Sequence, residues 1–281
     1  MEIFAPAKIN FGLSIGTKQE DGYHPISSIF LPVSLYDKIN IKLSGKSGID
    51  LITKSETVPC DQTNLCWKAA DLFIRTFNID SGIRIELEKN IPVGAGLGGG
   101  SSDAAAVLSA LNNLTGNKIT TADIRKTAKE LGADVPFFID STPAAVSGIG
   151  EIIEPAVFNW DMKILLAAPD FEISTKEAYS AFDSGIDKKR PLTDYSAVLS
   201  SLRIMDEFKE RVINDFESVL FDKYSDLRIL KNKLYDTGAD YVSLTGSGSV
   251  VYGMFAEKET AKTAESQIRK DCKTYLTDII K

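Results

Sequence analysis

The glycine-rich segment from Pro92 to Leu108, P-V-G-A-G-L-G-G-G-S-S-D-A-A-A-V-L, constrains this chain more than any other part of it. Five glycines stand among the seven positions from 94 to 100, and two serines lead from them into an alanine-rich stretch. A backbone without Cβ atoms folds closely around a ligand, and its N–H groups add to the positive end of the following helix. A plain turn has no need of five residues that each cost ordering entropy. The segment therefore predicts an anion-binding loop.

Two common phosphate-binding loops fit this segment less well. Gly94, Gly96 and Gly99 satisfy the G-x-G-x-x-G pattern of a dinucleotide-binding turn. However, the strand expected before it, residues 83–87, alternates apolar and polar residues, which favours a half-buried antiparallel strand over the first strand of a doubly wound sheet. A Walker A loop needs Gly-Lys-Ser/Thr after the glycines, and the sequence has Ser-Ser-Asp there instead.

Composition sets the limits for the rest of the chain. With 281 residues, 43% apolar and 25% charged, it is typical globular material of about two domains. Three cysteines without metal-ligand spacing indicate free thiols, and a single histidine excludes a histidine-based metal site. The net charge of -7 disfavours nucleic acid as a partner. Without a leader pattern or a run of 18 apolar residues, we expect a cytoplasmic protein that does not bind membranes. A monomer or weak homodimer is expected as its assembly state.

Hydrophobic periodicity predicts an α+β protein. The first half is expected to hold strands at 9–15, 29–35, 38–43 and 83–87 and helices near 65–77, 102–114 and 122–131. The first strand should bury one face and carry Lys8 and Asn10 on its open face. Gly132 is expected to end the third helix as a left-handed cap.

A second pattern begins after the turn-rich residues 147–155. It predicts strands at 163–168, 241–244 and 250–255, helices near 227–235 and 258–271, a helix capped by Ser174, and a final strand. The strands 241–244 and 250–255 flank a tight Gly/Ser turn. We therefore expect two domains, residues 1–155 and 156–281.

The glycine-rich segment resembles the shared second motif of the GHMP kinases, the family of galactokinase, homoserine kinase, mevalonate kinase and phosphomevalonate kinase. That motif is close to P-x-x-x-G-L-G-S-S-A-A. Four further motifs resemble the branch that phosphorylates the 2-hydroxyl of a cytidylyl methylerythritol in the non-mevalonate route to isoprenoids: A-P-A-K-I-N-F-G-L, D-G-Y-H, L-G-A-D-V-P-F-F and S-L-T-G-S-G-S. The resemblance implies ATP and Mg²⁺ as reaction partners, a ribosomal-protein-like N-terminal domain and a ferredoxin-like C-terminal domain.

Two candidate catalytic residues follow from the resemblance. Asp134 on its own is typical of a turn, because it lies between Gly132 and Pro136. The resemblance implies instead that Asp134 is the base that takes the proton from the acceptor hydroxyl. Lys8 on its own would be a solvated lysine. In the family position it keeps the aspartate ionised and lowers the pKa of the acceptor hydroxyl.

Substrate-binding residues are also implied by the resemblance. Tyr23 and His24 alone would be a turn with a packed aromatic residue. In the family pattern Tyr23 stacks on the cytidine, and His24 reads the edge of the cytosine by main-chain and side-chain hydrogen bonds. Tyr179 is a candidate for the second stacking aromatic, and Asn10 is a further candidate substrate-binding residue.

The remaining positions are assigned to ATP. Asn64 would otherwise be a helix N-cap, and Gly246 with Ser247 a hairpin turn. The glycine-rich segment contributes Pro92, Gly94, Gly96, Leu97, Gly98, Gly99, Gly100, Ser101 and Ser102. Ser102 is also the candidate Mg²⁺ ligand, since such ions keep waters and few protein ligands.

Two other functions stay open at this point. The chain could be a related kinase for another alcohol, such as homoserine or mevalonate, in which case activity would not depend on cytidine. It could also be a sensor that binds nucleotide and metabolite without transferring a phosphoryl group, although such a protein has no need of the base at Asp134. A Ser-His-Asp hydrolase is rejected, because His24 is the only histidine and does not stand in a nucleophile-elbow context.

Overall fold

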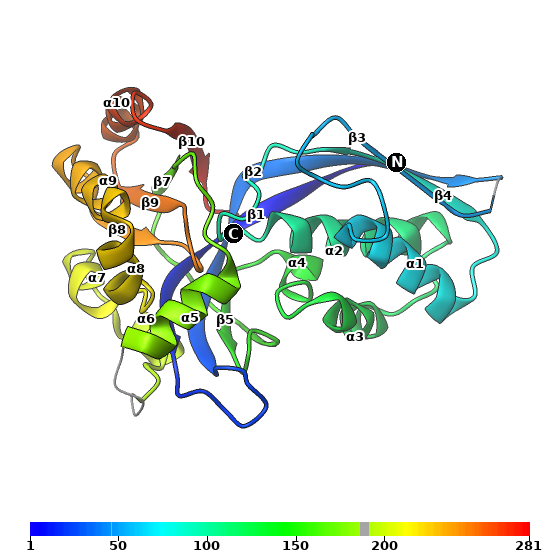
Figure 1. The fold of residues 1–281 in the computed structure, drawn as a ribbon, viewed down its shortest axis with the longest axis horizontal. Coiled ribbons are helices and arrows are strands. Elements are labelled where there is room, and N and C mark those ends of the chain that lie inside the picture. Colours follow the sequence, from blue (N-terminus) through cyan, green and yellow to red (C-terminus); the bar gives the residue numbers. More distant parts are fainter. Residues whose placement is uncertain (46, 186–190) are drawn as a thin grey trace. The chain divides into compact units, whose positions relative to one another are not determined.

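The computed structural model describes residues 1–45, 47–185 and 191–281 and confirms the α+β class (Figure 1). The strands are β1 (Glu2–Ile15), β2 (Ile26–Ser44), β3 (Ile49–Thr53), β4 (Gly82–Glu88), β5 (Ala144–Ser147), β6 (Ile152–Pro155), β7 (Lys163–Ala168), β8 (Tyr241–Leu244), β9 (Val251–Phe255) and β10 (Lys273–Asp278). The helices are α1 (Leu65–Phe77), α2 (Gly99–Leu114), α3 (Thr121–Leu131), α4 (Phe137–Asp140), α5 (Thr175–Gly185), α6 (Tyr195–Ser201), α7 (Asp206–Arg211), α8 (Glu217–Lys223), α9 (Ser225–Asp236) and α10 (Lys258–Ile268).

Contacts divide the described chain into two units, and neither is continuous in sequence. Unit 1 comprises residues 1–7, 35–92 and 98–141, and unit 2 comprises 8–34, 93–97 and 142–281. The strands β1 and β2 each contribute residues to both units, as does the glycine-rich segment. The domain boundary expected at residue 155 stays a prediction.

The long strand β2 is the centre of the first sheet, whose order is β3-β4-β2-β5-β6, with β1 also paired to β2. The expectation of two separate strands, 29–35 and 38–43, is wrong, because β2 runs unbroken for 19 residues. Asp37 suggests a break in the sequence, but its carboxylate is fully buried and accepts hydrogen bonds from the backbone N–H groups of Asn90 at 2.6 Å and Ile91 at 2.9 Å. The polar residue thus joins β2 to the two residues that precede the glycine-rich segment.

Strand β1 is covered on both sides in its second half. All residues from Ala7 to Ile15 are buried, and Lys8 and Asn10 are only 4% and 2% exposed. The prediction of a strand with one open face is therefore wrong. The alternating apolar residues gave the strand correctly, but its other face packs against segments that lie far away in the sequence.

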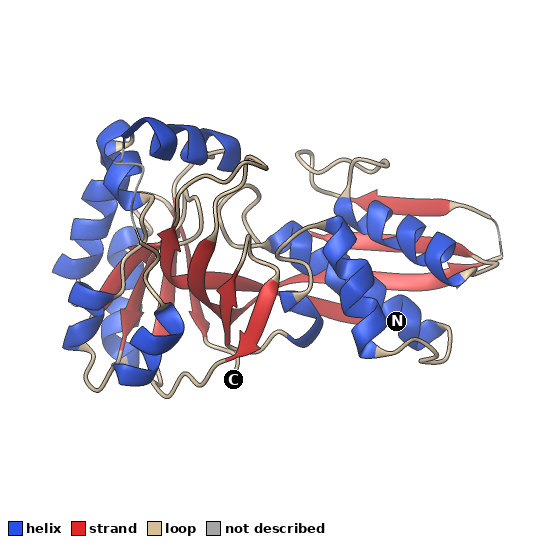
Figure 2. Ribbon diagram, turned by 90° about the horizontal axis from the view of Figure 1, so that it is seen from below, coloured by secondary structure: helices blue, strands red, loops and turns tan. Residues whose placement is uncertain are grey.

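Unit 1 places α1, α2 and α3 on one side of its strands (Figure 2). The helix α1 has the predicted bounds, and its N-cap Asn64 accepts a hydrogen bond from the backbone N–H of Cys66. The helix α2 begins at Gly99, three residues earlier than predicted, so the last glycines belong to its first turn. Gly132 is not a left-handed cap, since its φ of 160° and ψ of 158° are those of extended backbone.

Unit 2 contains the second sheet, with the order β10-β7-β9-β8 and antiparallel pairing throughout. The helices α9 and α10 pack against it. Its core is a cluster of apolar side chains that includes Leu165, Val242, Leu244 and Phe255. The predicted helix end at Gly238 is confirmed by its φ of +93° directly after α9.

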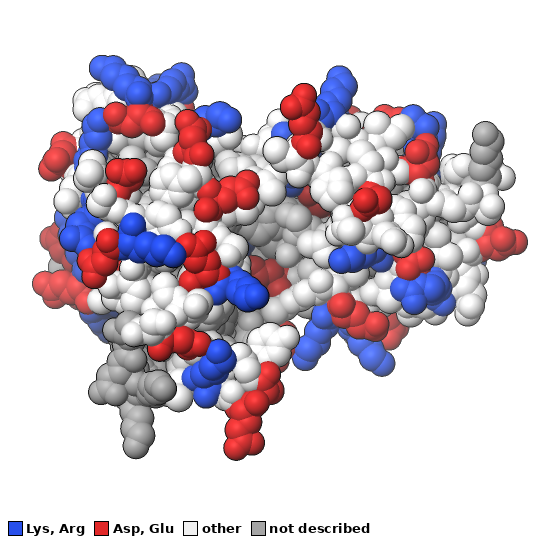
Figure 3. Space-filling view, viewed as in Figure 1, with Lys and Arg blue, Asp and Glu red and all other residues white. Residues whose placement is uncertain are grey.

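Charged side chains of both signs are interspersed on the surface drawn in Figure 3. Several form ion pairs, such as Arg125 with Asp140 at 2.7 Å and Lys223 with Glu177 at 2.6 Å. The described residues of the face drawn there carry no broad positive field, so an anionic ligand would depend on local donors. Within the described chain, no helix is long and apolar enough to span a membrane.

Candidate active site

The middle of β1, where Lys8 and Asn10 lie, holds a buried polar chain in unit 2. Lys8 donates from Nζ to Asn10 Oδ1 at 2.6 Å, and its ammonium lies 4.2 Å from the ring centroid of Phe30. Asn10 Nδ2 donates to Ser28 Oγ at 3.0 Å, and that hydroxyl donates to the carbonyl of Gly12 at 2.6 Å. The shared face of Lys8 and Asn10 is confirmed. Their side chains are held in fixed directions by each other and by β2.

Thr245 connects this strand to two loops of the same unit. Its Oγ1 accepts a hydrogen bond from the backbone N–H of Asn10 at 3.1 Å and lies 3.2 Å from the carbonyl oxygen of Gly96, to which it donates. The backbone N–H of Lys8 donates to the carbonyl of Leu97 at 2.9 Å. The structure thus brings together three segments of the chain: the first strand, the first half of the glycine-rich segment and the turn after β8. Thr245 stands in the motif S-L-T-G-S-G-S, but no pattern in the sequence distinguishes it from its neighbours.

Gly96 and Gly246 pack backbone against backbone. A Cβ on Gly96 would lie 2.1 Å from the carbonyl oxygen of Thr245, and a Cβ on Gly246 would lie 3.1 Å from both Cα and O of Gly96. Their φ angles are +77° and +54°, in the left-handed region. Glycine is needed at both positions for conformation and for space.

The second half of the glycine-rich segment belongs to unit 1 and opens α2. Gly98, with φ of 71°, is the N-cap, so the N–H groups of the first turn of a 16-residue helix follow directly. Such a terminus attracts anions. Ser102 Oγ is buried and makes no hydrogen bond within the described chain. A buried oxygen without a hydrogen bond is a suitable ligand for Mg²⁺, which keeps several waters and takes few ligands from the protein. No cluster of three or more metal-ligating side chains occurs among the described residues.

A buried ion cluster in unit 1 was missed by the sequence analysis. Lys89 Nζ contacts Oδ2 of both Asp37 and Asp103, the latter at 2.7 Å. Burial raises the pKa of Asp103 to about 7, although the nearby Lys89 ammonium acts in the opposite direction. Burial lowers the pKa of Lys89, but the two carboxylates outweigh it and leave that pKa raised. The cluster ties α2 to β2, and no local sequence pattern links its three members.

The raised pKa of Asp103 predicts a pH-dependent stability. In the unfolded chain this carboxyl is ionised at both pH 6 and pH 8, whereas in the folded protein it takes up a proton below about pH 7. The folded state is therefore favoured as the pH falls through 7. We expect the unfolding free energy to gain about 1 kcal/mol more between pH 8 and pH 6 in the wild type than in Asp103→Asn, as measured by urea denaturation. Equal changes in both proteins would contradict the assignment.

Asp134 lies in the turn between α3 and α4 and is half-buried. It belongs to unit 1 and Lys8 to unit 2, and that both act on one hydroxyl stays a prediction. Asn64 has the geometry of a plain helix cap, because it accepts from Cys66 N–H and donates from Nδ2 to the carbonyl of Pro59, both at 2.8 Å. Its nucleotide contact also stays a prediction.

The residues expected at the cytidine lie in unit 2. His24 is buried, its Nδ1 is 2.8 Å from the carbonyl oxygen of Gly16, and its Nε2 is 3.0 Å from Asp183 Oδ1. The ring of Tyr179 stacks on the ring of His24 at a centroid distance of 5.1 Å. Tyr23 is 58% exposed, so its ring presents a surface for stacking. The structure thus brings His24 and Tyr179 together, and Tyr23 is the residue that precedes His24 in the chain.

Asp183 is a further member of this group that the sequence analysis missed. Its Oδ2 accepts from Lys18 Nζ at 2.8 Å. The hydrogen bond from Lys18 lowers the pKa of the Asp183 carboxyl. Burial opposes this effect, and the charges of His24 and Lys18 add to it, so the pKa stays lowered. Asp183 therefore stays ionised near neutral pH and holds the imidazole in place.

Comparison with known proteins decides the family. The GHMP kinases N terminal domain matches residues 64–142, and the GHMP kinases C terminal domain matches residues 198–274. The 4-diphosphocytidyl-2-C-methyl-D-erythritol kinase of Chloroherpeton thalassium is 38% identical over 97% of this chain and 95% of its own length. The chain belongs to this kinase family. The enzyme of the same name from Caldicellulosiruptor saccharolyticus is 37% identical over 100% of this chain and 95% of its own.

Solved structures agree with this membership. A crystal structure of a 4-(cytidine 5'-diphospho)-2C-methyl-D-erythritol kinase is 32% identical, with a TM-score of 0.86 over 99% of both chains. A mevalonate kinase from Methanococcus jannaschii, at 14% identity and a TM-score of 0.77, shares the fold alone. The two-part GHMP architecture expected from the sequence is thereby confirmed.

Proposed function

We infer that this chain is an ATP-dependent kinase that phosphorylates the 2-hydroxyl of 4-diphosphocytidyl-2-C-methyl-D-erythritol, a step of non-mevalonate isoprenoid biosynthesis. The observation that carries the inference is the similarity to kinases of this name along 97% of the chain. The geometry supports it. Thr245 joins three features of the site: the buried Lys8–Asn10 pair, the glycine-rich segment and the turn after β8. These contacts fix candidate hydrogen-bond donors for the phosphates and for the acceptor.

In the proposed mechanism Asp134 accepts the proton of the acceptor hydroxyl as the γ-phosphoryl group is transferred. Lys8 supplies a positive charge that lowers the pKa of that hydroxyl, and Asn10 fixes the direction of the lysine. The N–H groups at the start of α2 and the turn at Gly246–Gly248 bind phosphate oxygens. The residues of the chain thus position the reactants and stabilise charge.

Mg²⁺ is proposed as the metal partner of ATP. Ser102 would hold it, because its buried Oγ makes no hydrogen bond within the described chain. When bound, the ion neutralises charge on the phosphate oxygens. Asp103 Oδ1 is a second buried oxygen without a hydrogen bond in the same helix turn, although its raised pKa leaves it largely protonated below about pH 7.

Cytidine recognition is proposed for Tyr23, His24 and Tyr179. Tyr23 offers an exposed ring, and Tyr179 and Asp183 hold the imidazole of His24 from two sides. Because both ring nitrogens of His24 already face Gly16 and Asp183, the hydrogen bonds that discriminate among base edges are proposed for the main chain of His24, whereas an aromatic ring stacks on any base.

Replacing Tyr23 by alanine should weaken binding of the cytidylyl substrate specifically. Loss of one base–aromatic stack costs about 1–3 kcal/mol, so we expect the KM for this substrate to rise by about tenfold or more and the KM for ATP to stay within about twofold. Phe4→Ala is the matched control, because Phe4 is similarly exposed, at 57%, and lies outside the group around His24. Equal increases in both KM values would remove Tyr23 from the cytidine site.

The function itself is tested by ADP release from ATP and Mg²⁺ with the purified protein. The acceptors are 4-diphosphocytidyl-2-C-methyl-D-erythritol, homoserine and mevalonate, each in a separate reaction. Turnover only with the cytidylyl substrate is expected. Turnover with another acceptor would retain the phosphoryl transfer and discard the cytidine assignment, whereas ATP binding without turnover on any acceptor would favour a sensor.

A further inference from the structure

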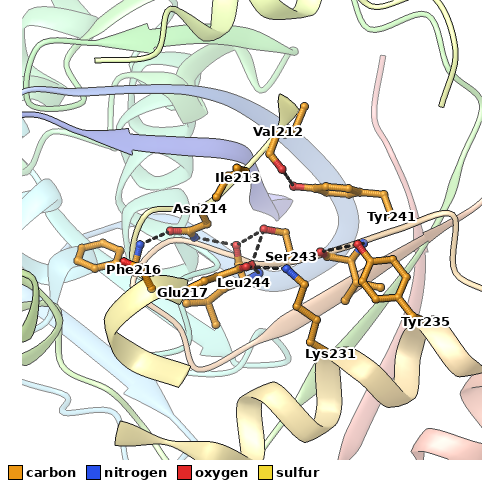
Figure 4. Close-up of polar contacts among 12 residues, drawn as sticks. Val212, Ile213, Asn214, Phe216, Glu217, Lys231, Tyr235, Tyr241, Ser243 and Leu244 are labelled. Atoms are coloured by element: carbon orange, nitrogen blue, oxygen red, sulfur yellow. Dashed lines mark hydrogen bonds and ion pairs between the residues drawn. The ribbon is translucent and has the colours of Figure 1, made fainter. Parts of the chain in front are cut away.

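The segment from Ile213 to Glu217, just before and at the start of α8, lies in unit 2 against the end of β8 (Figure 4). Its backbone pairs with β1, since Leu13 N–H donates to the carbonyl of Ile213 at 2.9 Å and Asp215 N–H donates to the carbonyl of Leu13 at 2.8 Å. The segment is thereby fixed to the strand that carries Lys8 and Asn10.

Asn214 uses its side-chain amide fully in this position. It is 0% exposed, its Nδ2 donates to the carbonyls of Leu244 at 2.8 Å and Gly246 at 2.9 Å, and its Oδ1 accepts from the backbone N–H of Phe216 at 3.0 Å. Both amide hydrogens therefore go to the backbone on either side of Thr245. A buried amide with all these bonds made is an orienting group, because losing its donors removes a hydrogen bond from the buried carbonyl of Gly246 and leaves that of Leu244 with the longer bond from Ser243 Oγ at 3.3 Å.

Glu217 holds the same strand end from its N–H side. Its Oε1 accepts from the backbone N–H of Leu244 at 2.8 Å and from Ser243 Oγ at 2.9 Å, and its Oε2 accepts from Lys231 Nζ at 2.6 Å. Figure 4 shows these bonds converging on the carboxylate of Glu217. Leu244 is thus bound through both its N–H and its carbonyl before the chain enters the turn.

The turn that follows is the one that contacts the glycine-rich segment. Thr245 Oγ1 bonds to Asn10 and Gly96, and Gly248 N–H closes the turn on the carbonyl of Thr245 at 2.9 Å. The carbonyl of Gly246, which Asn214 binds, lies inside this turn. This carbonyl and the N–H group of Ser247 belong to the same planar peptide, so the direction of the carbonyl determines the direction of the Ser247 N–H group.

We propose that Asn214 is a positioning residue for ATP: through the carbonyls of Leu244 and Gly246 it sets the turn Gly246–Gly248 in the orientation that binds the phosphates. Glu217 and Lys231 support it from the other side. This inference rests on the proposed function, in which that turn contacts ATP. It adds a residue whose effect on ATP passes through the backbone, without contact to either substrate.

The test is Asn214→Asp, which keeps the size and the Oδ1 acceptor and replaces the two N–H donors by an oxygen facing two carbonyls. We expect the KM for ATP to rise by roughly 10- to 100-fold, since small misplacements of a binding group have effects of this size, while the KM for the cytidylyl substrate stays within about twofold.

Tyr241→Phe is the control. Its hydroxyl belongs to the same buried network and donates to the carbonyl of Val212 at 3.0 Å, with no bond to the turn. It should lower the thermal midpoint without changing either KM.

Both variants are compared at a temperature at which circular dichroism shows them folded. An unchanged KM for ATP in Asn214→Asp, or equal increases in both KM values, would overturn the proposal. If Asn214→Asp yields no folded protein, Asn214→Ser, which retains one donor, is expected to show the same selective increase. Direct binding of ATP with Mg²⁺, measured by calorimetry, separates this inference from the function. Weaker ATP binding in the variant supports the positioning role even if the wild type transfers no phosphoryl group to any acceptor tested.

Discussion

Asp134→Asn is expected to lower kcat by about 10²–10⁴ while the affinity for ATP stays close to that of the wild type, because an amide cannot accept the proton of the acceptor hydroxyl. The change preserves size, and the half-buried turn between α3 and α4 tolerates an amide. The measurement is steady-state ADP release with the cytidylyl substrate, combined with ATP binding by calorimetry.

Asp140→Asn is the matched control. Asp140 lies six residues further along, at the end of α4, and pairs on the surface with Arg125 at 2.7 Å. Removing an exposed ion pair of this kind costs little, so kcat should not change. Full activity in Asp134→Asn would remove Asp134 as the base, and equal losses in both variants would indicate a structural effect of α4 instead.

Gly96→Ala should have the second largest effect, on the folded structure and on ATP binding together. The new Cβ would lie 2.1 Å from the carbonyl oxygen of Thr245, and the φ of +77° is unfavourable for alanine. The glycine-rich segment and the turn after β8 must separate. We expect a loss of about 3 kcal/mol or more from strain and overlap combined, seen as a lower thermal midpoint and a KM for ATP raised at least about tenfold.

Gly48→Ala separates the effect of backbone strain from the effect of steric overlap. Gly48 also has a positive φ, +101°, but a Cβ there would meet no atom within 4 Å. Its substitution should cost only the conformational strain, about 1 kcal/mol, with no effect on the KM for ATP. If the two variants lose the same stability and Gly96→Ala keeps its KM, the close approach of Gly96 to Thr245 does not matter for the site.

Local patterns predicted those elements that local interactions form. The helix 65–77 and the strand 163–168 have the expected bounds, because a capping asparagine and a short apolar run define them without help from the rest of the chain. The short strand β3 (Ile49–Thr53) and the helices α6, α7 and α8 were missed. These are short elements whose formation depends on what they pack against, and single-sequence periodicity is weak over so few residues.

The residues of the candidate site show the same contrast between those that are close in sequence and those whose partners are distant. The glycine-rich segment and Asp134 were singled out because their residues are contiguous and match a family motif, and the role of Asp134 stays a prediction. Asp37, Lys89 and Asp103 were not found, because the distance in sequence between Asp37 and Lys89 hides their ion pair. Asn214 and Glu217 were missed for the same reason, since their partners Leu244 and Gly246 lie some thirty residues later. Thr245 stood in a motif already noted, and the available signal was only a hydroxyl residue directly before the glycines of T-G-S-G.

The discontinuous composition of unit 2 has a consequence for synthesis on the ribosome. The strand β1 leaves the exit tunnel first, yet Leu13 forms its hydrogen bonds with Ile213 and Asp215, two hundred residues later. Most of unit 1 lies between these partners and is translated before them. The nascent chain therefore carries β1 with β2 but without the segment around Ile213 through most of translation. Unit 2 closes only near the end, and the apolar surface exposed until then is open to chaperone binding and to aggregation.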